Sequence, residues 1–136
     1  MTKLYIDTNV FVYAFEDSKN LFGGDISSSA SRLFFEAISC KYQVIISSWA
    51  LEELAGLRKL EQAHMLFTLL KQKVLKIEHT SEDVDSAKKA SPRHFHDELH
   101  GLLAIKAGAD YIVTRNTQDF VHFKERIPVV KPEWLL

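Results

Sequence analysis

The chain has 136 residues, 46% of them hydrophobic, and a formal net charge of −1. This length is typical of one compact domain, and the apolar content excludes a disordered protein. The near-zero charge excludes a global attraction to nucleic acid, so any such binding must use a local patch of the surface. We therefore expect a single globular domain over residues 1–136.

The cysteine content and the hydropathy of the sequence indicate the cellular compartment in which the protein works. Cys40 is the only cysteine, which excludes an internal disulfide and a thiolate zinc cluster. There is no apolar run long enough to cross a membrane. The first residues also lack the basic and apolar segments of a secretory signal. These features favour a cytoplasmic protein that does not contact the membrane.

Short apolar or β-branched segments predict five strands, at residues 3–6, 43–47, 74–78, 110–114 and 128–131. Most alternate with helical patterns, at 30–38, from Leu51 on to Leu70, at 80–90, and in an apolar stripe from Leu99 to Ala107 that ends at Gly108. This alternation predicts an α/β fold with a parallel sheet covered on both faces. In such sheets reactive groups gather beyond the carboxyl ends of the strands.

Two acids follow predicted strands. Asp7 comes directly after the first strand, and Asp119 comes five residues after the fourth. Each acid alone is typical of a helix cap or a turn. Because both belong to the same edge of one parallel sheet, together they indicate an acidic site there.

Helical phase adds two more acids. Glu53 shares the apolar side of its helix with Ala50 and Leu57, so we expect it to be partly shielded, either in the site or in a salt bridge with Arg or Lys. Its neighbour Glu52 points away from this side, and we expect it to be a solvated surface charge. Asp97 shares a side of its helix with Gly101 and Ala104. These small neighbours leave room for a ligand or for close helix packing, and phase does not separate the two.

Converging carboxylates raise one another's pKa values, and a hard divalent cation removes that conflict. Mg²⁺ or Mn²⁺ prefers oxygen ligands, binds phosphate oxygens and lowers the pKa of an attacking water. The acids therefore indicate hydrolysis of a phosphodiester.

Three segments, "LYIDTNVFVYAF", "SSWALEEL" and "DELHGLLAIKAGADYIVTRNTQDF", resemble the PIN-domain family, and in particular its VapC-type ribonuclease toxins. The resemblance implies a three-layer α/β/α sandwich with a five-stranded parallel sheet. It also implies an endoribonuclease site that uses Mg²⁺ or Mn²⁺. The catalytic and metal-binding acids of the family correspond to Asp7, Glu53, Asp97 and Asp119.

The resemblance also assigns supporting residues. Thr8, Asn9 and Thr114 are expected to orient the carboxylates or the water of the metal. Asn116 stands where many members have Asp, so it supplies no charge to a second metal, and one-metal and two-metal chemistry both stay open. The candidates for RNA contact, which adjoin the acids in sequence, are Arg93, His94, His96 and Arg115.

Partners follow from the same resemblance. VapC-type toxins form homodimers, and a protein antitoxin lies in an apolar groove near their active site. We therefore expect a homodimer, an antitoxin and an RNA substrate. The predicted groove uses some of Phe11, Phe15, Phe22, Phe34, Phe35 and Phe67.

The stretch "HFHDELH" permits another interpretation. His96 and His100 stand four residues apart, as in the H-E-x-x-H motif of zinc peptidases. We interpret Asp97 as the functional residue, and His94, His96 and His100 as flanking groups that contact RNA phosphate or lie on the surface.

Two other classes of enzyme share parts of these motifs. A haloacid-dehalogenase-type phosphatase places D-x-D after its first strand, but Asn9 replaces the second acid here. The His-Asp doublet at 96–97 also occurs in all-helical HD phosphohydrolases, against which the five predicted strands argue. A PIN-like domain that binds RNA or acts as a scaffold without catalysis is the main alternative.

Overall fold

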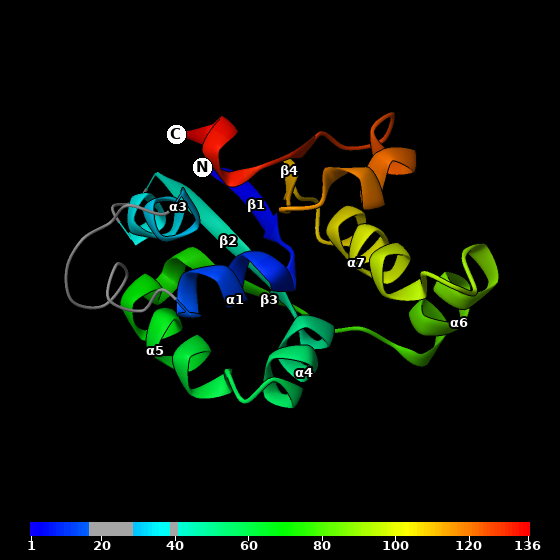
Figure 1. The fold of residues 1–136 in the computed structure, drawn as a ribbon, viewed down its shortest axis with the longest axis horizontal. Coiled ribbons are helices and arrows are strands. Elements are labelled where there is room, and N and C mark those ends of the chain that lie inside the picture. The colour runs from blue at the N-terminus through cyan, green and yellow to red at the C-terminus, as the bar shows by residue number, and fades with distance from the viewer. Residues whose placement is uncertain (17–28, 39–40) are drawn as a thin grey trace.

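The computed structural model describes residues 1–16, 29–38 and 41–136. Its centre is one parallel sheet of five strands in the order β3-β2-β1-β4-β5 (Figure 1). The strands are β1 (Thr2–Ile6), β2 (Tyr42–Ser47), β3 (Val74–Ile77), β4 (Tyr111–Val113) and β5 (Val129–Val130). All five predicted strands and their parallel pairing are confirmed.

Helices connect the strands. The α-helices are α1 (Thr8–Glu16), α3 (Ser29–Ile38), α4 (Ser48–Gly56), α5 (Leu60–Leu70), α6 (Ser81–Ala90) and α7 (Phe95–Lys106). The short 3₁₀ helices are η1 (Lys71–Lys73), η2 (Thr117–Phe123) and η3 (Pro132–Leu135). No helix in the described ranges is long and apolar enough to span a membrane.

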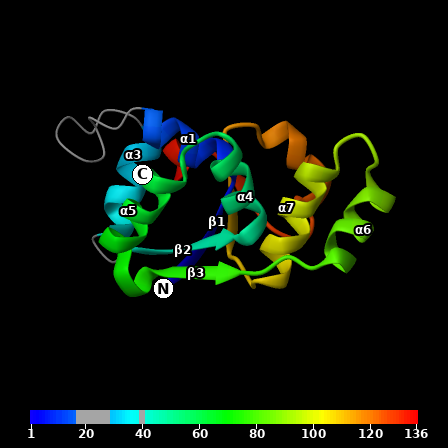
Figure 2. The same ribbon diagram turned by 90° about the horizontal axis from the view of Figure 1, so that it is seen from below.

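Alternation along β1 divides the core into two layers. Leu4 and Ile6 point to one face, where they join the apolar cluster formed with α1, α3, α4 and α5. Tyr5 points to the other face and packs with α6, α7 and η2. Figure 2 shows α1, α3 and α5 separated from α6 and α7. The sheet is thus covered on both faces, as the predicted α/β fold requires.

The helical region expected from Leu51 to Leu70 is two helices. α4 ends at Gly56, and α5 begins at Leu60. Between them Arg58 adopts a positive φ of 59°. A non-glycine residue in this left-handed conformation turns the chain and interrupts the helix. The apolar spacing continues across the break, which is why the sequence pattern does not reveal it.

Gly101 provides close packing. A Cβ atom built on Gly101 would overlap the ring of Phe123. The space beside Gly101 on α7 is therefore filled by an aromatic side chain of η2. The small neighbours of Asp97 were expected to leave room either for a ligand or for close helix packing. At Gly101 the structure shows close packing.

Three of the six phenylalanines assigned to a groove belong to the core. Phe11 and Phe34 are completely buried, and Phe15 is 3% exposed. Their rings pack on one another, with centroids 5.1 Å apart for Phe11 and Phe34. Their assignment to a docking groove is wrong, because one sheet face accommodates all three rings. Phe67 is partly buried, whereas Phe22 and the Phe35 side chain lie outside the described residues.

Candidate active site

Asp7 is fixed at the carboxyl edge of the sheet by the neighbouring strand. Its backbone N–H donates to the carbonyl of Val113, at 2.9 Å. The Thr114 hydroxyl, one residue beyond β4, donates to Asp7 Oδ2 at 2.8 Å. The backbone N–H of Asn116 in turn donates to Thr114 Oγ1 at 3.1 Å. Parallel pairing of β1 and β4 therefore sets both the position and the orientation of the carboxylate.

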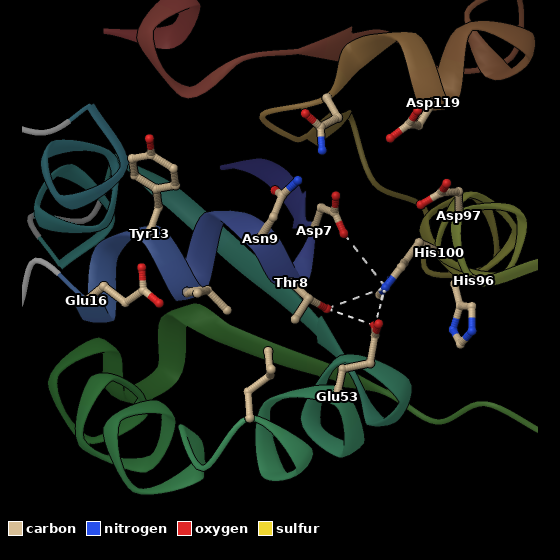
Figure 3. A pocket seen from close by; sticks show the side chains of 13 residues that line it. Asp7, Thr8, Asn9, Tyr13, Glu16, Glu53, His96, Asp97, His100 and Asp119 are labelled. Atoms are coloured by element: carbon tan, nitrogen blue, oxygen red, sulfur yellow. Dashed lines mark hydrogen bonds and ion pairs between the residues drawn. The ribbon is translucent and has the colours of Figure 1, made fainter. Parts of the chain in front are cut away.

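A cleft of about 470 Å³ opens at this edge (Figure 3). All four predicted acids line it, although they come from separate elements: Asp7 precedes α1, Glu53 lies on α4, Asp97 on α7 and Asp119 on η2. Among the predicted supporting residues, Thr8, Asn9 and Asn116 also line the cleft. Thr114 is completely buried and does not line the cleft, but its hydroxyl donates to the Asp7 carboxylate.

Glu53 reaches the cleft because α4 begins directly at the end of β2. The Ser47 hydroxyl caps α4 by accepting the N–H of Ala50, at 3.0 Å. One turn later, Glu53 Oε1 accepts a hydrogen bond of 2.9 Å from Thr8. The Glu53 side chain is 30% exposed, whereas that of Glu52 is 63% exposed, so the phase argument separated these two neighbours correctly.

The ion-pairing partner of Glu53 is a histidine rather than Arg or Lys. His100 Nε2 lies 2.6 Å from Glu53 Oε1 and 3.7 Å from Asp7 Oδ1. His100 is only 2% exposed, so the expectation that it lies on the surface or contacts RNA phosphate is wrong. The sequence does hold a signal for its position: 97, 100, 101 and 104 form an i, i+3, i+4, i+7 stripe on α7. The phase argument applied to Asp97 therefore also places His100 at the site.

Hydrogen bonding indicates that His100 is an imidazolium. Tyr5 donates its hydroxyl hydrogen to Ser47 at 2.8 Å, so its oxygen accepts from His100 Nδ1 at 2.6 Å. Nε2 donates to Glu53, and both ring nitrogens then carry hydrogen. Burial alone would lower the pKa of His100. The hydrogen bond with Glu53 and the charges of Asp7, Glu53 and Asp97 outweigh burial and raise it.

The pKa values of the acids in the cleft are shifted in different directions. Burial raises the pKa of Asp7, against the opposing effects of His100 and Thr114. Burial and the charges of Asp119 and Asp7 raise the pKa of Asp97. Burial opposes ionisation of Glu53 too, but the hydrogen bond and charge of His100 dominate and lower its pKa. The cleft thus has an excess of negative charge on the side of Asp7 and Asp97, which one imidazolium does not offset.

A divalent cation fits this excess. The donors lining the cleft are carboxylate oxygens, which Mg²⁺ and Mn²⁺ prefer, and a cation would relieve the repulsion that raises the pKa of Asp97. Within the described part of the chain, no three His, Cys, Asp or Glu side chains are already arranged around one point as metal ligands. The carboxylates therefore share the cleft without converging.

The predicted RNA-contacting residues have separate positions. His96 is exposed and lines the cleft, whereas Arg93 and His94 are exposed just before α7 and do not line it. Arg115 forms an ion pair of 3.0 Å with Glu133 and lies over the Tyr13 ring at 4.8 Å. Its backbone N–H donates to Asn9 Oδ1 at 3.3 Å, which ties the loop after β4 to the start of α1.

The zinc interpretation of "HFHDELH" conflicts with the geometry of His100. Both of its ring nitrogens are engaged, by Tyr5 and by Glu53. His96 packs instead against Trp49, with ring centroids 5.4 Å apart. The two histidines therefore do not form a pair of zinc ligands.

The fold and the site define an α/β protein with an acidic cleft beyond the carboxyl ends of a five-stranded parallel sheet, lined by acids from four separate parts of the chain. The PIN-domain family model matches residues 3–118, and the chain belongs to this family. Family membership overturns the haloacid-dehalogenase and HD-phosphohydrolase alternatives.

Among solved structures, the chain is similar to the crystal structure of VapBC2 from Rickettsia felis bound to a DNA fragment from their promoter. The sequence identity is 19% and the TM-score is 0.56, with 96% of this chain and 98% of that chain covered. At this identity the likeness concerns the fold alone. No curated protein matches the sequence significantly.

Proposed function

We propose that the protein is a divalent-metal-dependent endoribonuclease and the toxin of a toxin–antitoxin pair in the cytoplasm. The observation that carries the proposal is the presence of Asp7, Glu53, Asp97 and Asp119 in one cleft of a PIN-domain chain. A purely structural role does not account for this arrangement, because gathering mutually repelling carboxylates around the buried Asp7 destabilises a fold.

Asp7, Asp97 and Asp119 are the proposed metal ligands, with Glu53 as the fourth acid. Both hydrogen bonds of Glu53 use Oε1, which leaves Oε2 without such a bond to the described residues and free for a cation or its water. Bound Mg²⁺ or Mn²⁺ would supply a Lewis acid for a phosphate oxygen and would lower the pKa of the attacking water. Asn116 adds no charge, so this donor set suits one metal ion better than two.

The other polar residues act by positioning. Thr114 holds Asp7 through Oδ2, and Thr8 holds Glu53 through Oε1. Asn9 orients the loop that carries Asn116, through the backbone of Arg115. In this proposal His100 limits the repulsion between Asp7 and Glu53 before substrate binds. His96, Arg115 and, farther from the cleft, Arg93 and His94 are the proposed contacts for the RNA.

The likeness in fold to a chain of the VapBC2 complex supports an antitoxin partner. The rim of the cleft supplies a surface for such a partner. Tyr13 and Leu57 line the cleft and are 53% and 55% exposed. On the neighbouring helix α5, Met65 and Leu69 are 49% and 41% exposed. Exposed apolar side chains of this size favour association, and we retain the homodimer as part of the proposal.

The competing function is a PIN-like module that binds RNA, or serves as a scaffold, without cleaving. Purified protein incubated with total RNA, with Mg²⁺ or Mn²⁺ and with EDTA, separates the two. The nuclease predicts internal cleavage with either metal and none with EDTA. Binding without cleavage under all of these conditions would favour the module.

A further inference from the structure

We propose that an aromatic cluster beside the cleft, formed by Trp49, Phe95 and His96, is a stacking platform for an unpaired RNA base. The inference rests on the proposed nuclease function and assigns the side chains that would hold a base of its substrate. The cluster consists of residues from the starts of α4 and α7. Ring centroids lie 4.1 Å apart for Phe95 and His96, 5.4 Å for Trp49 and His96, and 6.1 Å for Trp49 and Phe95.

The cluster adjoins the acids. On α4, Trp49 precedes Glu53 by four residues and so lies one turn away on the same side of the helix. On α7, His96 immediately precedes Asp97 and is four residues before His100. Figure 3 shows His96 projecting from α7 on the side of the cleft where Glu53 enters from α4. A phosphate held at the acids would therefore place a neighbouring base within reach of His96.

His96 is the accessible ring of the cluster. It is exposed and lines the cleft, whereas Trp49 and Phe95 are partly buried against the core on that side of the sheet. The larger rings thus support His96 from behind. A planar ring fixed in this way is the feature on which single-stranded nucleic acids stack, with little regard to base identity.

Packing alone does not explain the choice of Trp49. Its indole N–H is buried and has no hydrogen-bond partner among the described residues. A buried Trp whose role is structural usually satisfies this donor. The Trp49 ring contacts Phe95 and His96, so it provides a large aromatic surface behind His96.

The charge around the cluster fits RNA. The segment between Asp85 and the site acid Asp97 contains Lys88, Lys89, Arg93 and two histidines, although the whole chain has a net charge of −1. Lys88, Lys89 and Arg93 are exposed, and Lys88 Nζ lies 5.1 Å from the centre of the Phe95 ring. Basic groups interleaved with aromatic rings match a ligand that alternates phosphates and bases.

The test is equilibrium binding of RNA in EDTA, in an Asp7→Asn background that prevents cleavage. The probes are an unstructured oligonucleotide, the same sequence in a duplex, and an abasic strand of equal length. We expect His96→Ala and His96→Leu to weaken binding of the unstructured RNA at least about fivefold, and His96→Phe to restore it. His64→Ala on α5 is the matched control, because His64 is also exposed and lies beside an aromatic ring, Phe67, but does not line the cleft.

Loss of stacking should also remove the preference for the unstructured RNA over the duplex and the abasic strand. The wild-type histidine should prefer the unstructured RNA to the duplex and the abasic strand, and His96→Ala should bind all three similarly. Two results would refute the proposed stacking platform. One is equal binding of all three probes by the protein that retains His96, and the other is equal affinity of His96→Ala and His64→Ala for the unstructured RNA. Cleavage with Mg²⁺ by protein with Asp7 intact is measured separately: its absence would defeat the nuclease proposal while the binding results still decide the platform.

Discussion

His100 Nε2 lies 2.6 Å from Glu53 Oε1, inside the cleft and almost completely shielded from solvent. This contact joins α7 to α4, two helices far apart in the sequence. Asp7 Oδ1 lies 3.7 Å from the same nitrogen, so one imidazolium faces two carboxylates. His100 therefore reduces the repulsion within the acidic site in the absence of metal.

Replacing His100 should leave the repulsion between Asp7 and Glu53 without an opposing charge and so destabilise the metal-free protein. We expect His100→Gln to lower the free energy of unfolding in EDTA by about 1–3 kcal/mol, because Tyr5 and Glu53 lose a charged partner. The pKa of His100 is raised in the folded protein, so its stabilising effect is complete below its ordinary value of 6.5 and is lost as the pH rises through the raised value. The difference between wild type and variant, measured by urea unfolding, should shrink over that upper range.

The control for this variant is His122→Gln. His122 also pairs with an acid, Glu98, at 2.5 Å, but its side chain is 52% exposed. Glu98 itself is only 10% exposed, but solvent around the His122 ring screens the pair, so we expect a smaller loss, about 1 kcal/mol. Mg²⁺ should stabilise His100→Gln more than wild type or His122→Gln, because a cation replaces the missing charge. Equal effects of the two substitutions would contradict the proposed role of His100.

Asp7→Asn should stabilise the metal-free protein. Burial raises the pKa of Asp7, so ionising it costs stability as the pH rises above its ordinary value of 3.8. Asn keeps an oxygen to accept from Thr114 and carries no charge. The gain in free energy of unfolding should be absent below pH 3.8, where Asp7 is protonated in both the folded and the unfolded protein. It should be complete above the raised pKa of Asp7. Thermal unfolding in EDTA across this range measures it, and a variant less stable than wild type at neutral pH would refute the argument.

Gly101→Ala should destabilise the fold. The new methyl group would overlap the Phe123 ring, so η2 must move away from α7. Overpacking of this kind costs about 1–3 kcal/mol. Because Asp119 lies on η2, cleavage should fall as well. Gly56→Ala is the matched control, since a Cβ atom there meets nothing within 4 Å. Equal destabilisation by the two substitutions would disprove the close packing of α7 on η2.

Arg115→Ala should weaken RNA binding and reduce the slope of log affinity against log salt by about 1, as for one lost phosphate contact. Lys41→Ala is the control, because Lys41 is exposed at the start of β2, away from the cleft, in an ion pair with Glu36. Salt titrations of binding give both slopes. An unchanged slope for Arg115→Ala would assign Arg115 to the ion pair with Glu133 and the stacking on Tyr13 alone.

The sequence predicted the fold and the position of the acids because both depend on local patterns. Strand periodicity located the sheet, and helical phase distinguished Glu53 from Glu52. Helical phase places His100 on the side of α7 that carries Asp97, but no local pattern encodes its partners, because Tyr5 of β1 and Glu53 of α4 come from other elements. The same holds for Phe11 and Phe34, whose ring packing depends on how α1 and α3 meet.

The central claim is that these carboxylates catalyse metal-dependent RNA cleavage. Single-turnover cleavage of one RNA with Mg²⁺, by wild type, Asp7→Asn and Asp85→Asn, tests it most directly. Asp85 is an exposed acid on α6 that does not line the cleft. We predict cleavage by wild type and Asp85→Asn at the same rate, and a loss of at least about a hundredfold in Asp7→Asn. Equal rates for all three proteins, or no cleavage by any of them, would contradict the claim.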